Sequence, residues 1–454
     1  MTARRLVILS VVVLLLFGFI LLVERKMPST EDRQREGELH WNLPEERIDE
    51  IHLEHSGASI RLKKEGETWR ITQPETYPAD AAAVSDLTAQ LGDLKRAEGE
   101  GAGSRPEDYG LKPPSAKATV FWTDEKSKAR QQRTVELGVE IPGTDFTAAR
   151  VESSGNVVFV PTSAAAAVRK NLADLKSKDL FGGSALDTGR LDIDRGRGRL
   201  VLARKGGAWW LEQPTADLAS TETAEELAGD LAALRVQEFV TGPERENLPA
   251  LGLAPPLYRV TLTDTKGKAV TVELGSTRTQ GNAIYGRREG QVFTVDNSIV
   301  EDVSREGEAF RSTQLVRFDR ADVTGVEGTF GAAKYALSQK DGGWTLAGKP
   351  VLASSADDIL SAVLDLKSRA FLEPDAAGAA QAQPSAGEVR VALSNGERWD
   401  IRFFPRKGVV TAAVGRRPGA FDLPEDTVSR LESIFRKTAQ TPAPTPTARP
   451  GKKP

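Results

Sequence analysis

The chain has 454 residues, 39% hydrophobic and 28% charged, which is long enough for about three globular domains of ~100–200 residues each. Its 61 Lys and Arg residues nearly balance its 64 Asp and Glu residues, which argues against nucleic-acid binding because that function needs a strong basic excess. The sequence contains no cysteine, which excludes disulfides, thiolate metal sites, cysteine nucleophiles and lipoprotein acylation.

An uninterrupted apolar stretch lies near the amino terminus. Residues 6–23 read LVILSVVVLLLFGFILLV, and a helix of that length, at ~1.5 Å per residue, spans ~27 Å, about the thickness of a hydrocarbon core. The alternative is a cleaved signal peptide, but its apolar region is usually ~7–15 residues long and ends at a small-x-small site, which residues 24–28 do not offer. The sequence therefore predicts a transmembrane helix over residues 6–23, after a short tail at residues 1–5.

The flanking charges leave the orientation of this segment open. Arg4 and Arg5 precede it, whereas four basic residues between positions 25 and 35 follow it, so a literal Lys and Arg count places the body inside the cell. That rule is weak for long translocated domains, and the short tail is typical of a signal anchor. We expect a single-pass protein of the bacterial inner membrane with the bulk of its chain on the periplasmic side.

The rest of the chain repeats one pattern three times. The string WRITQP at residues 69–74 returns as WWLEQP at 209–214 and, more loosely, as WTLAGKP at 344–350. The closing prolines lie 140 residues apart (74 to 214) and then 136 apart (214 to 350), so each copy is a whole domain rather than a solenoid unit of ~20–50 residues. We expect a polar spacer at 24–46, repeats at 47–185, 186–314 and 315–437, and a disordered Pro-rich tail at 438–454.

Each repeat opens with strands that are followed by a helix. In the first repeat, apolar residues alternate along strands that end at Trp69 and Ile71, before Pro74 interrupts the pairing. An apolar stripe at helical spacing then occurs in every copy, at Val84, Leu87, Leu91 and Leu94, at Ala224, Leu227, Leu231 and Leu234, and at Ala356, Ile359, Val363 and Leu366. The expected N-caps are Asp80, Ser220, and Ser354 or Ser355.

A loop, two hairpins and a final helix complete each repeat. The loop is YGLKPP at 109–114 and LGLAPP at 251–256, whereas DAAGAAQAQP at 375–384 predicts a flexible substitute in the third repeat. In the first hairpin of each repeat we expect residues 118–122 to pair with 135–138, 258–263 with 272–275, and 389–393 with 399–404. In the second hairpin we expect residues 147–151 to pair with 157–160, 283–287 with 292–295, and 409–414 with 421–423. The final helices end near Phe181, Phe310 and Phe435. Hairpins without βαβ alternation predict an α+β fold with antiparallel sheets.

These motifs together have a counterpart in a known family. They are the anchor, the W-x-I/L-x-x-P strand ends, the helix stripes, the loop glycines at 110 and 252, and the VELG strand ends at Gly138 and Gly275. On these features the chain resembles the domain of unknown function 4340 family of bacterial membrane-anchored proteins, over about residues 47–437 and most weakly in the third repeat. The resemblance implies no established activity and no catalytic residues. It does imply genes that often lie beside those for ABC-type transporter subunits and a gliding-motility-like auxiliary protein.

The sequence offers little support for catalysis. Histidine occurs only at 40, 52 and 55, and positions 52 and 55 point to opposite faces of a strand, so a solvated pair is favoured over a metal site. No Gly-x-Ser-x-Gly elbow is present, and the RGRGR string at 195–199 lacks the context of a phosphate-binding loop, which favours an exposed turn. We expect no catalytic residue, no metal and no cofactor.

Arginines recur near the turn of the second hairpin in every repeat. They are Arg150 in the first, Arg287 and Arg288 in the second, and Arg416 and Arg417 in the third. They are candidates for a basic edge that contacts an acidic partner, although hairpin tips are commonly charged for solubility alone. Trp69, Trp209 and Trp344 are better explained as core residues packed on the helix stripe than as a ligand-stacking surface.

Three classes of function are compatible with this sequence. The favoured one is a non-enzymatic envelope protein, anchored by residues 6–23, whose repeats contact other membrane or envelope proteins as an accessory or scaffold of a transporter-associated complex. The alternatives are a module that binds glycans or anionic polymers, and a hydrolase without a recognisable motif. The missing triad and metal signatures disfavour the hydrolase.

Overall fold

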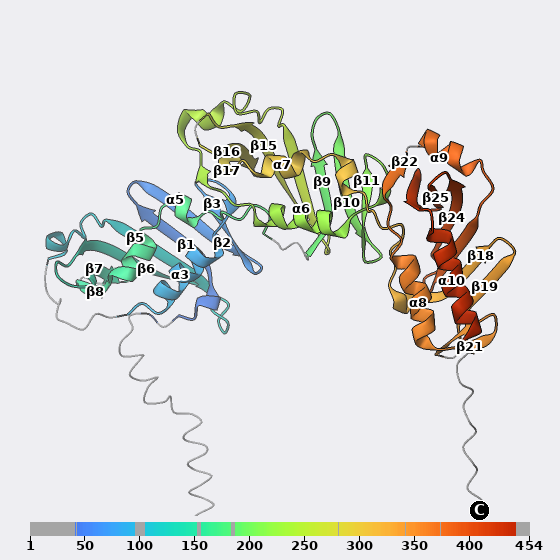
Figure 1. The fold of residues 1–454 in the computed structure, drawn as a ribbon. Coiled ribbons are helices and arrows are strands. Elements are labelled where there is room, and N and C mark those ends of the chain that lie inside the picture. The colour runs from blue at the N-terminus through green and yellow to red at the C-terminus, as the bar shows by residue number, and fades with distance from the viewer. Residues whose placement is uncertain are drawn as a thin grey trace, which may run out of the picture. The chain divides into compact units, whose positions relative to one another are not determined.

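The protein contains three antiparallel sheets, each with helices packed on one face (Figure 1). The computed structural model describes residue 41 and residues 43–95, 105–151, 156–182, 187–279, 281–340, 342–372 and 374–441. The three sheets belong to the three repeats expected from the sequence, and the predicted α+β architecture is confirmed. The predicted anchor at residues 6–23 lies outside the described residues; within them, no helix combines the length and hydrophobicity needed to cross a membrane.

The first repeat builds an eight-stranded sheet in the order β4-β3-β2-β1-β5-β6-β7-β8. Its elements are η1 (Glu45–Arg47), β1 (Ile48–His55), β2 (Ala58–Glu65), β3 (Thr68–Gln73), β4 (Tyr77–Pro78), α3 (Ala81–Gly92), η2 (Pro106–Tyr109), β5 (Ala116–Thr123), β6 (Arg130–Glu140), β7 (Phe146–Val151), β8 (Val158–Pro161), α4 (Thr162–Val168) and α5 (Leu172–Leu175). Strand β1 pairs with both β2 and β5, so it joins the two halves of the repeat across the insertion of α3.

The second repeat has nine strands in the order β12-β11-β10-β9-β14-β15-β16-β17-β13. Its elements are β9 (Thr188–Asp194), β10 (Arg199–Lys205), β11 (Ala208–Gln213), β12 (Asp217–Leu218), α6 (Thr221–Ala233), β13 (Glu238–Phe239), η4 (Gly242–Glu246), β14 (Tyr258–Asp264), β15 (Ala269–Thr277), β16 (Ala283–Arg288), β17 (Gln291–Asp296), α7 (Ile299–Ser304) and η5 (Gly307–Phe310). The edge strand β13, too short for a sequence pattern to reveal, pairs with β17.

The third repeat has the same order, β21-β20-β19-β18-β23-β24-β25-β26-β22. Its elements are η6 (Arg320–Asp322), β18 (Val323–Phe330), β19 (Ala333–Lys340), β20 (Gly343–Leu346), β21 (Lys349–Val351), α8 (Ala353–Leu364), β22 (Ala370–Leu372), α9 (Pro374–Gln381), β23 (Gly387–Leu393), β24 (Arg398–Arg406), β25 (Val409–Val414), β26 (Ala420–Pro424) and α10 (Thr427–Gln440). Helices α8 and α10 lie side by side over the sheet (Figure 1).

The helix stripes form the core as predicted. All twelve stripe residues are buried, each set against the inward-facing strand residues of its own repeat. The Asp80 side chain accepts a hydrogen bond from Ala83 N, and that of Ser220 accepts one from Thr223 N, which confirms two of the predicted caps. In the third repeat α8 begins at Ala353, so Ser354 and Ser355 lie inside the helix and do not cap it.

The loop motif and the VELG motif of the first two repeats are two halves of one contact. Gly110 and Gly252 each adopt φ of 65°, a left-handed conformation that favours glycine. Each loop then lays a backbone carbonyl, of Tyr109 or Leu251, directly over Gly138 or Gly275, where a Cβ atom would collide with it. This close approach explains why both motifs contain glycine.

Three segments differ from the sequence interpretation. Residues 375–384 were expected to be flexible, yet Pro374–Gln381 forms α9, whose Ala377 and Ala380 are buried. Trp41 and Leu43, assigned to the polar spacer, are buried in the first core, where Leu43 N donates to the Gly92 carbonyl. Helix α10 continues through residues 438–440, which were expected to belong to the tail, because Thr438 is buried and bonds the Ile434 carbonyl.

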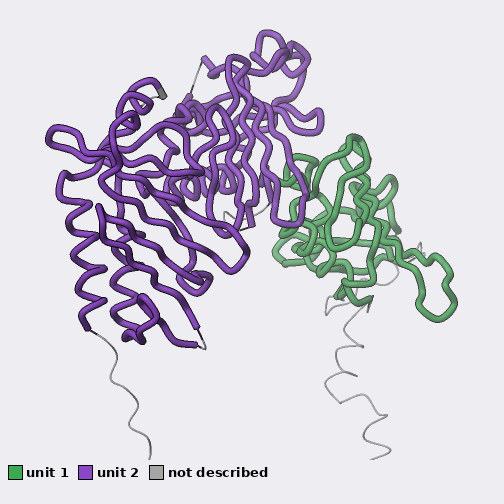
Figure 2. The backbone as a smooth tube through the Cα atoms, turned by 90° about the vertical axis from the view of Figure 1, so that its right-hand side faces the viewer, with its two compact units in different colours: residues 1–178 green, residues 179–454 purple. Residues whose placement is uncertain are grey.

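The chain divides into two compact units, residues Met1–Lys178 and Asp179–Pro454 (Figure 2). The first unit contains the strands and helices of the first repeat, from η1 to α5, and the second unit contains those of the second and third repeats.

Replacing Gly275 with Ala tests the loop contact. The added Cβ collides with the Leu251 carbonyl, so we expect a loss of ~1–3 kcal/mol in the stability of the second repeat, in the range of overpacked sites. Gly198→Ala is the matched control, because a Cβ there meets no atom within 4 Å. Hydrogen exchange of β14–β16 in the full chain measures the difference; equal protection in both variants contradicts the proposed contact.

Candidate functional site

The candidate arginines of the second hairpins are bound to carboxylates or backbone carbonyls. Arg150 of β7 and Arg287 of β16 each lie across the sheet from a glutamate: Arg150 Nε is 2.6 Å from Glu136 Oε2, and Arg287 Nε is 2.6 Å from Glu273 Oε2. Both pairs are half-buried, with side-chain exposures of 20% and 27% for the arginines. Their charges are therefore neutralised within their own sheets. Contact of these two residues with a partner remains a prediction.

Arg288 and Arg417 bind the segments that lead into their repeats. Arg288 NH1 donates to the carbonyls of Asp179 and Leu180, at 3.2 and 2.5 Å. Arg417 NH1 donates to the carbonyl of Gln314 at 2.5 Å, and its NH2 to that of Ser312 at 2.8 Å. These guanidinium groups stabilise linkers, and the side chain of Arg417 is fully buried rather than exposed at a hairpin tip.

A buried ion cluster joins the second and third repeats. Asp217 of β12 is completely buried; its Oδ1 accepts from Arg417 Nε at 2.5 Å and its Oδ2 accepts from Arg311 Nε at 2.8 Å. Burial lowers the pKa of Arg417, while the hydrogen bonds and charge of Asp217 oppose that effect. At the matching position 140 residues earlier, the first repeat has Tyr77 instead of an acid.

Apolar and aromatic contacts surround this cluster. Ala208 and Leu218 of the second repeat are buried in the hydrophobic core of the third. Trp210 stacks on Trp399 with ring centroids 6.0 Å apart and an interplanar angle of 13°. Arg416 lies over both rings, at 5.1 and 5.2 Å, and its NH2 bonds Glu397 Oε1 at 3.0 Å, which lowers the pKa of that carboxyl. The candidate residue Arg416 is thus part of the junction.

The histidines and the glycine-rich string have local roles. His52 Nε2 lies 2.7 Å from Glu50 Oε1, whereas His55 Nε2 bonds the Lys170 carbonyl at 2.9 Å, so the two rings have separate partners. Residues 195–198 form the predicted turn between β9 and β10, but Arg195 is not exposed: its Nε donates to the Val303 carbonyl at 2.8 Å. Among the described residues no cluster of three His, Asp or Glu side chains has a geometry that suits a metal ion.

The tryptophans of the repeated string lie at the core. Trp209 is fully buried, and Trp69 and Trp344 are partly buried and pack against the cores of the first and third repeats. The predicted packing role is confirmed for all three.

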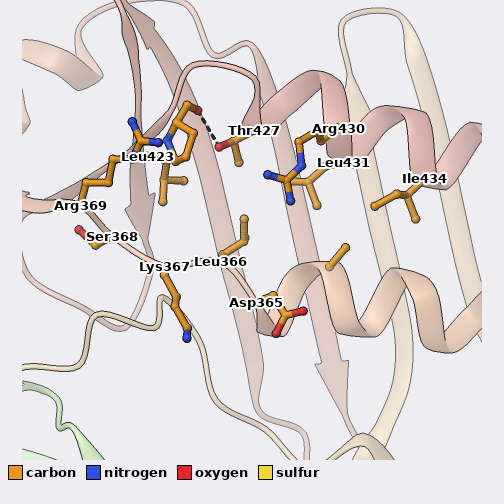
Figure 3. Close-up of a pocket in the computed structure, with 12 residues that line it drawn as sticks. Asp365, Leu366, Lys367, Ser368, Arg369, Leu423, Thr427, Arg430, Leu431 and Ile434 are labelled. Carbon is orange, nitrogen blue, oxygen red and sulfur yellow. Dashed lines mark hydrogen bonds between the residues drawn. The ribbon is translucent and has the colours of Figure 1, made fainter.

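A groove in the third repeat is the surface that sequence reasoning missed. It is a hollow of about 290 Å³ between the end of α8, the start of α10 and the end of β26. Its apolar lining consists of Ala362, Leu366, Leu423, Pro424, Leu431 and Ile434. Figure 3 shows Arg430 extending from α10 over this lining and Thr427 bonding the Pro424 carbonyl at the helix start.

The rim of this groove carries an excess of positive charge. Lys367, Arg369 and Arg430 are exposed, and none forms an ion pair with any residue that the structure describes. Asp365 is the only carboxylate among the lining residues. Helical and sheet periodicity could not have revealed this site, because its residues come from three separate elements and two of its cations lie in a connecting segment.

Comparison with known proteins gives one family. The sequence profile described as a domain of unknown function (DUF4340) matches residues 69–248 and 243–385, which together span more than half of the chain. Both matched segments cross the boundary between consecutive repeats. No curated protein matches the chain.

Replacing Asp217 with Asn tests the junction. Arg417 and Arg311 lose the buried carboxylate that both contact, and breaking a buried pair costs about 3–5 kcal/mol, so the contact between the second and third repeats should weaken strongly. We expect faster hydrogen exchange in β11, β12, β25 and β26 of the full chain, with β1–β8 unchanged.

Asp192→Asn is the matched control for this prediction. Asp192 pairs with Arg199, whose side chain is 52% exposed, and such surface pairs contribute only about 0–1 kcal/mol. If the amide hydrogens of β11, β12, β25 and β26 exchange at the same rate in both variants, the buried cluster does not hold the junction together.

Proposed function

The chain belongs to the domain of unknown function 4340 family, which has no assigned activity, and we propose that it is a non-enzymatic scaffold that binds other proteins in the bacterial cell envelope. The observation that carries this proposal is the groove of the third repeat, where an apolar lining is bordered by three exposed cations without ion-pair partners among the described residues. Elsewhere the protein pairs many of its arginines, for example Arg130 with Glu50 at 2.7 Å and Arg190 with Glu212 at 2.7 Å.

The junction between the second and third repeats supports a scaffold role. A partner held at the groove needs a fixed surface, and the Asp217 cluster and the Trp210–Trp399 stack connect that surface to a second sheet. A rigid surface loses less conformational entropy when it binds. The strands and helices of both repeats thus form one platform.

The proposed location and partners come from the sequence. The apolar segment at residues 6–23 anchors the protein in the inner membrane, and the repeats lie on the periplasmic side. Its partners are membrane or envelope proteins, and the gene neighbourhood implied by the family points to a transporter-associated complex. The chain then acts as an accessory subunit.

Orientation is tested with a reporter fused after Pro454. We expect a periplasmic alkaline phosphatase fusion to be active and a cytoplasmic fluorescent-protein fusion at the same point to be dark. A variant with Leu15 and Leu16 replaced by Arg is the control, because charges in the middle of an apolar segment oppose insertion. The reverse pair of signals would refute the periplasmic placement.

Partner binding is tested by affinity capture of the full-length protein from gently solubilised membranes. We expect specific membrane or envelope proteins to co-purify, and their recovery to fall several-fold when Arg369 and Arg430 are both replaced by Glu, since like charges then face an acidic partner. Arg436→Glu is the matched control, an exposed charge reversal on α10 outside the groove lining. Recovery of lipid or cell-wall material alone would contradict the proposal.

A further inference from the structure

The groove of the third repeat differs from the second repeat at three equivalent positions. Strands β13 and β22 pair with β17 and β26 in the same register, Phe239 with Phe293 and Phe371 with Phe421, so the two copies can be aligned residue by residue. The bridge between Gln314 and Lys367 likewise matches the bridge between Asp179 and Arg235.

The first of these positions has lost its counter-ion. In the second repeat Arg235 NH1 lies 2.5 Å from Asp179 Oδ1. In the third repeat the basic residue is retained as Lys367, but the bridged residue is Gln314, which carries no charge. Lys367 is therefore an exposed cation at a position that the second repeat neutralises.

The other two positions have gained positive charge. The backbone N–H of Arg369 donates to the Asp422 carbonyl, and in the second repeat the backbone N–H of Gln237 donates to the equivalent Thr294 carbonyl. Arg369 therefore occupies the position of a neutral glutamine. Asp302 is the fourth residue of α7, which follows β17 in the second repeat, and Arg430 is the fourth residue of α10, which follows β26 in the third. At this position the third repeat has a cation where the second has an acid. In the second repeat that acid bonds Arg305 NH2 at 2.8 Å, and Arg305 NH1 bonds Glu226 Oε2 at 2.9 Å.

The arrangement of these charges indicates the kind of ligand. In Figure 3 the three cations are spread along the hollow: Arg369 lies beside Leu423, Arg430 extends from α10, and Lys367 points away from that helix. A single phosphate or carboxylate would need donors that converge on one point. Separate cations along an apolar lining instead match several carboxylates on one chain, with apolar side chains between them.

We propose that this groove binds an acidic peptide segment of a partner protein, with an apolar side chain seated among Leu366, Leu431 and Ile434 and carboxylates paired with Lys367, Arg369 and Arg430. This inference rests on the proposed scaffold function and specifies its contact surface. The leucine and isoleucine lining favours a polypeptide over a polysaccharide, whose hydroxyl groups would be desolvated there without hydrogen-bond partners.

The test uses the full-length protein in detergent and a fluorescently labelled peptide of alternating Glu and Leu residues, with binding followed by anisotropy. We expect saturable binding that weakens about tenfold or more with Arg430→Glu, because reversing one contact charge loses about 1.4 kcal/mol or more. Lys367→Gln should weaken it by a smaller factor, and Arg436→Glu should leave it within about twofold. Raising the salt from about 0.05 to 0.5 M should also weaken binding, since the contacts are exposed.

Two further peptides and a vesicle separate the possible ligands. Replacing Glu by Lys in the peptide should abolish binding, and replacing Leu by Ser should reduce it. Stronger binding to phosphatidylglycerol vesicles or to polyglutamate than to the Glu-Leu peptide, or equal binding by the wild type and Arg430→Glu, would overturn the inference. If membrane proteins are captured but the peptide does not bind, the scaffold proposal stands and this assignment of the groove fails.

Discussion

The ion pair between Asp217 and Arg417 is the contact on which the arrangement of the second and third repeats depends. Both side chains are fully buried, and Asp217 is the carboxylate that Arg417 and Arg311 share, so loss of Asp217 would leave Arg417 without a counter-ion in the protein interior. Arg417 also donates to the Ser312 and Gln314 carbonyls, so the same side chain orders the linker between the repeats. One guanidinium group thus couples a strand of one sheet, a hairpin of the next and the chain that connects them.

The residues around this pair explain why two repeats share one compact unit. Ala208, Trp210 and Leu218 present an apolar edge to the third core. At the positions 140 residues earlier, the first repeat has Thr68, Arg70 and Pro78, which give its corresponding edge a more polar character. With Tyr77 in place of Asp217, the first repeat also lacks the buried acid. The division between the two compact units falls after Lys178.

The elements that depend on periodicity could be predicted from the sequence, and those that depend on tertiary partners could not. Helix stripes and hairpins repeat every few residues, so Leu87, Leu227 and Ile359 were identified as core. The arginines of the second hairpins were identified by position, but their burial depends on acids distant in sequence: Arg417 and Asp217 are 200 residues apart. Helix α9 was missed because its small residues and glycine suggested flexibility, whereas Ala377 and Ala380 pack against the sheet.

The groove shows where function can arise in a repeated fold. The apolar helix stripe of every copy and the loop glycines of the first two copies are required for packing and cannot change without loss of stability. The positions of Lys367, Arg369 and Arg430 are exposed, so their charge can change at little cost to the core. At the equivalent positions of the second repeat, Arg235 and Asp302 are in ion pairs and Gln237 carries no charge. In the third repeat all three positions carry cations without an ion-pair partner among the described residues. Unneutralised cations repel one another, so their accumulation in one copy is best explained by an acidic partner that stabilises them when it binds.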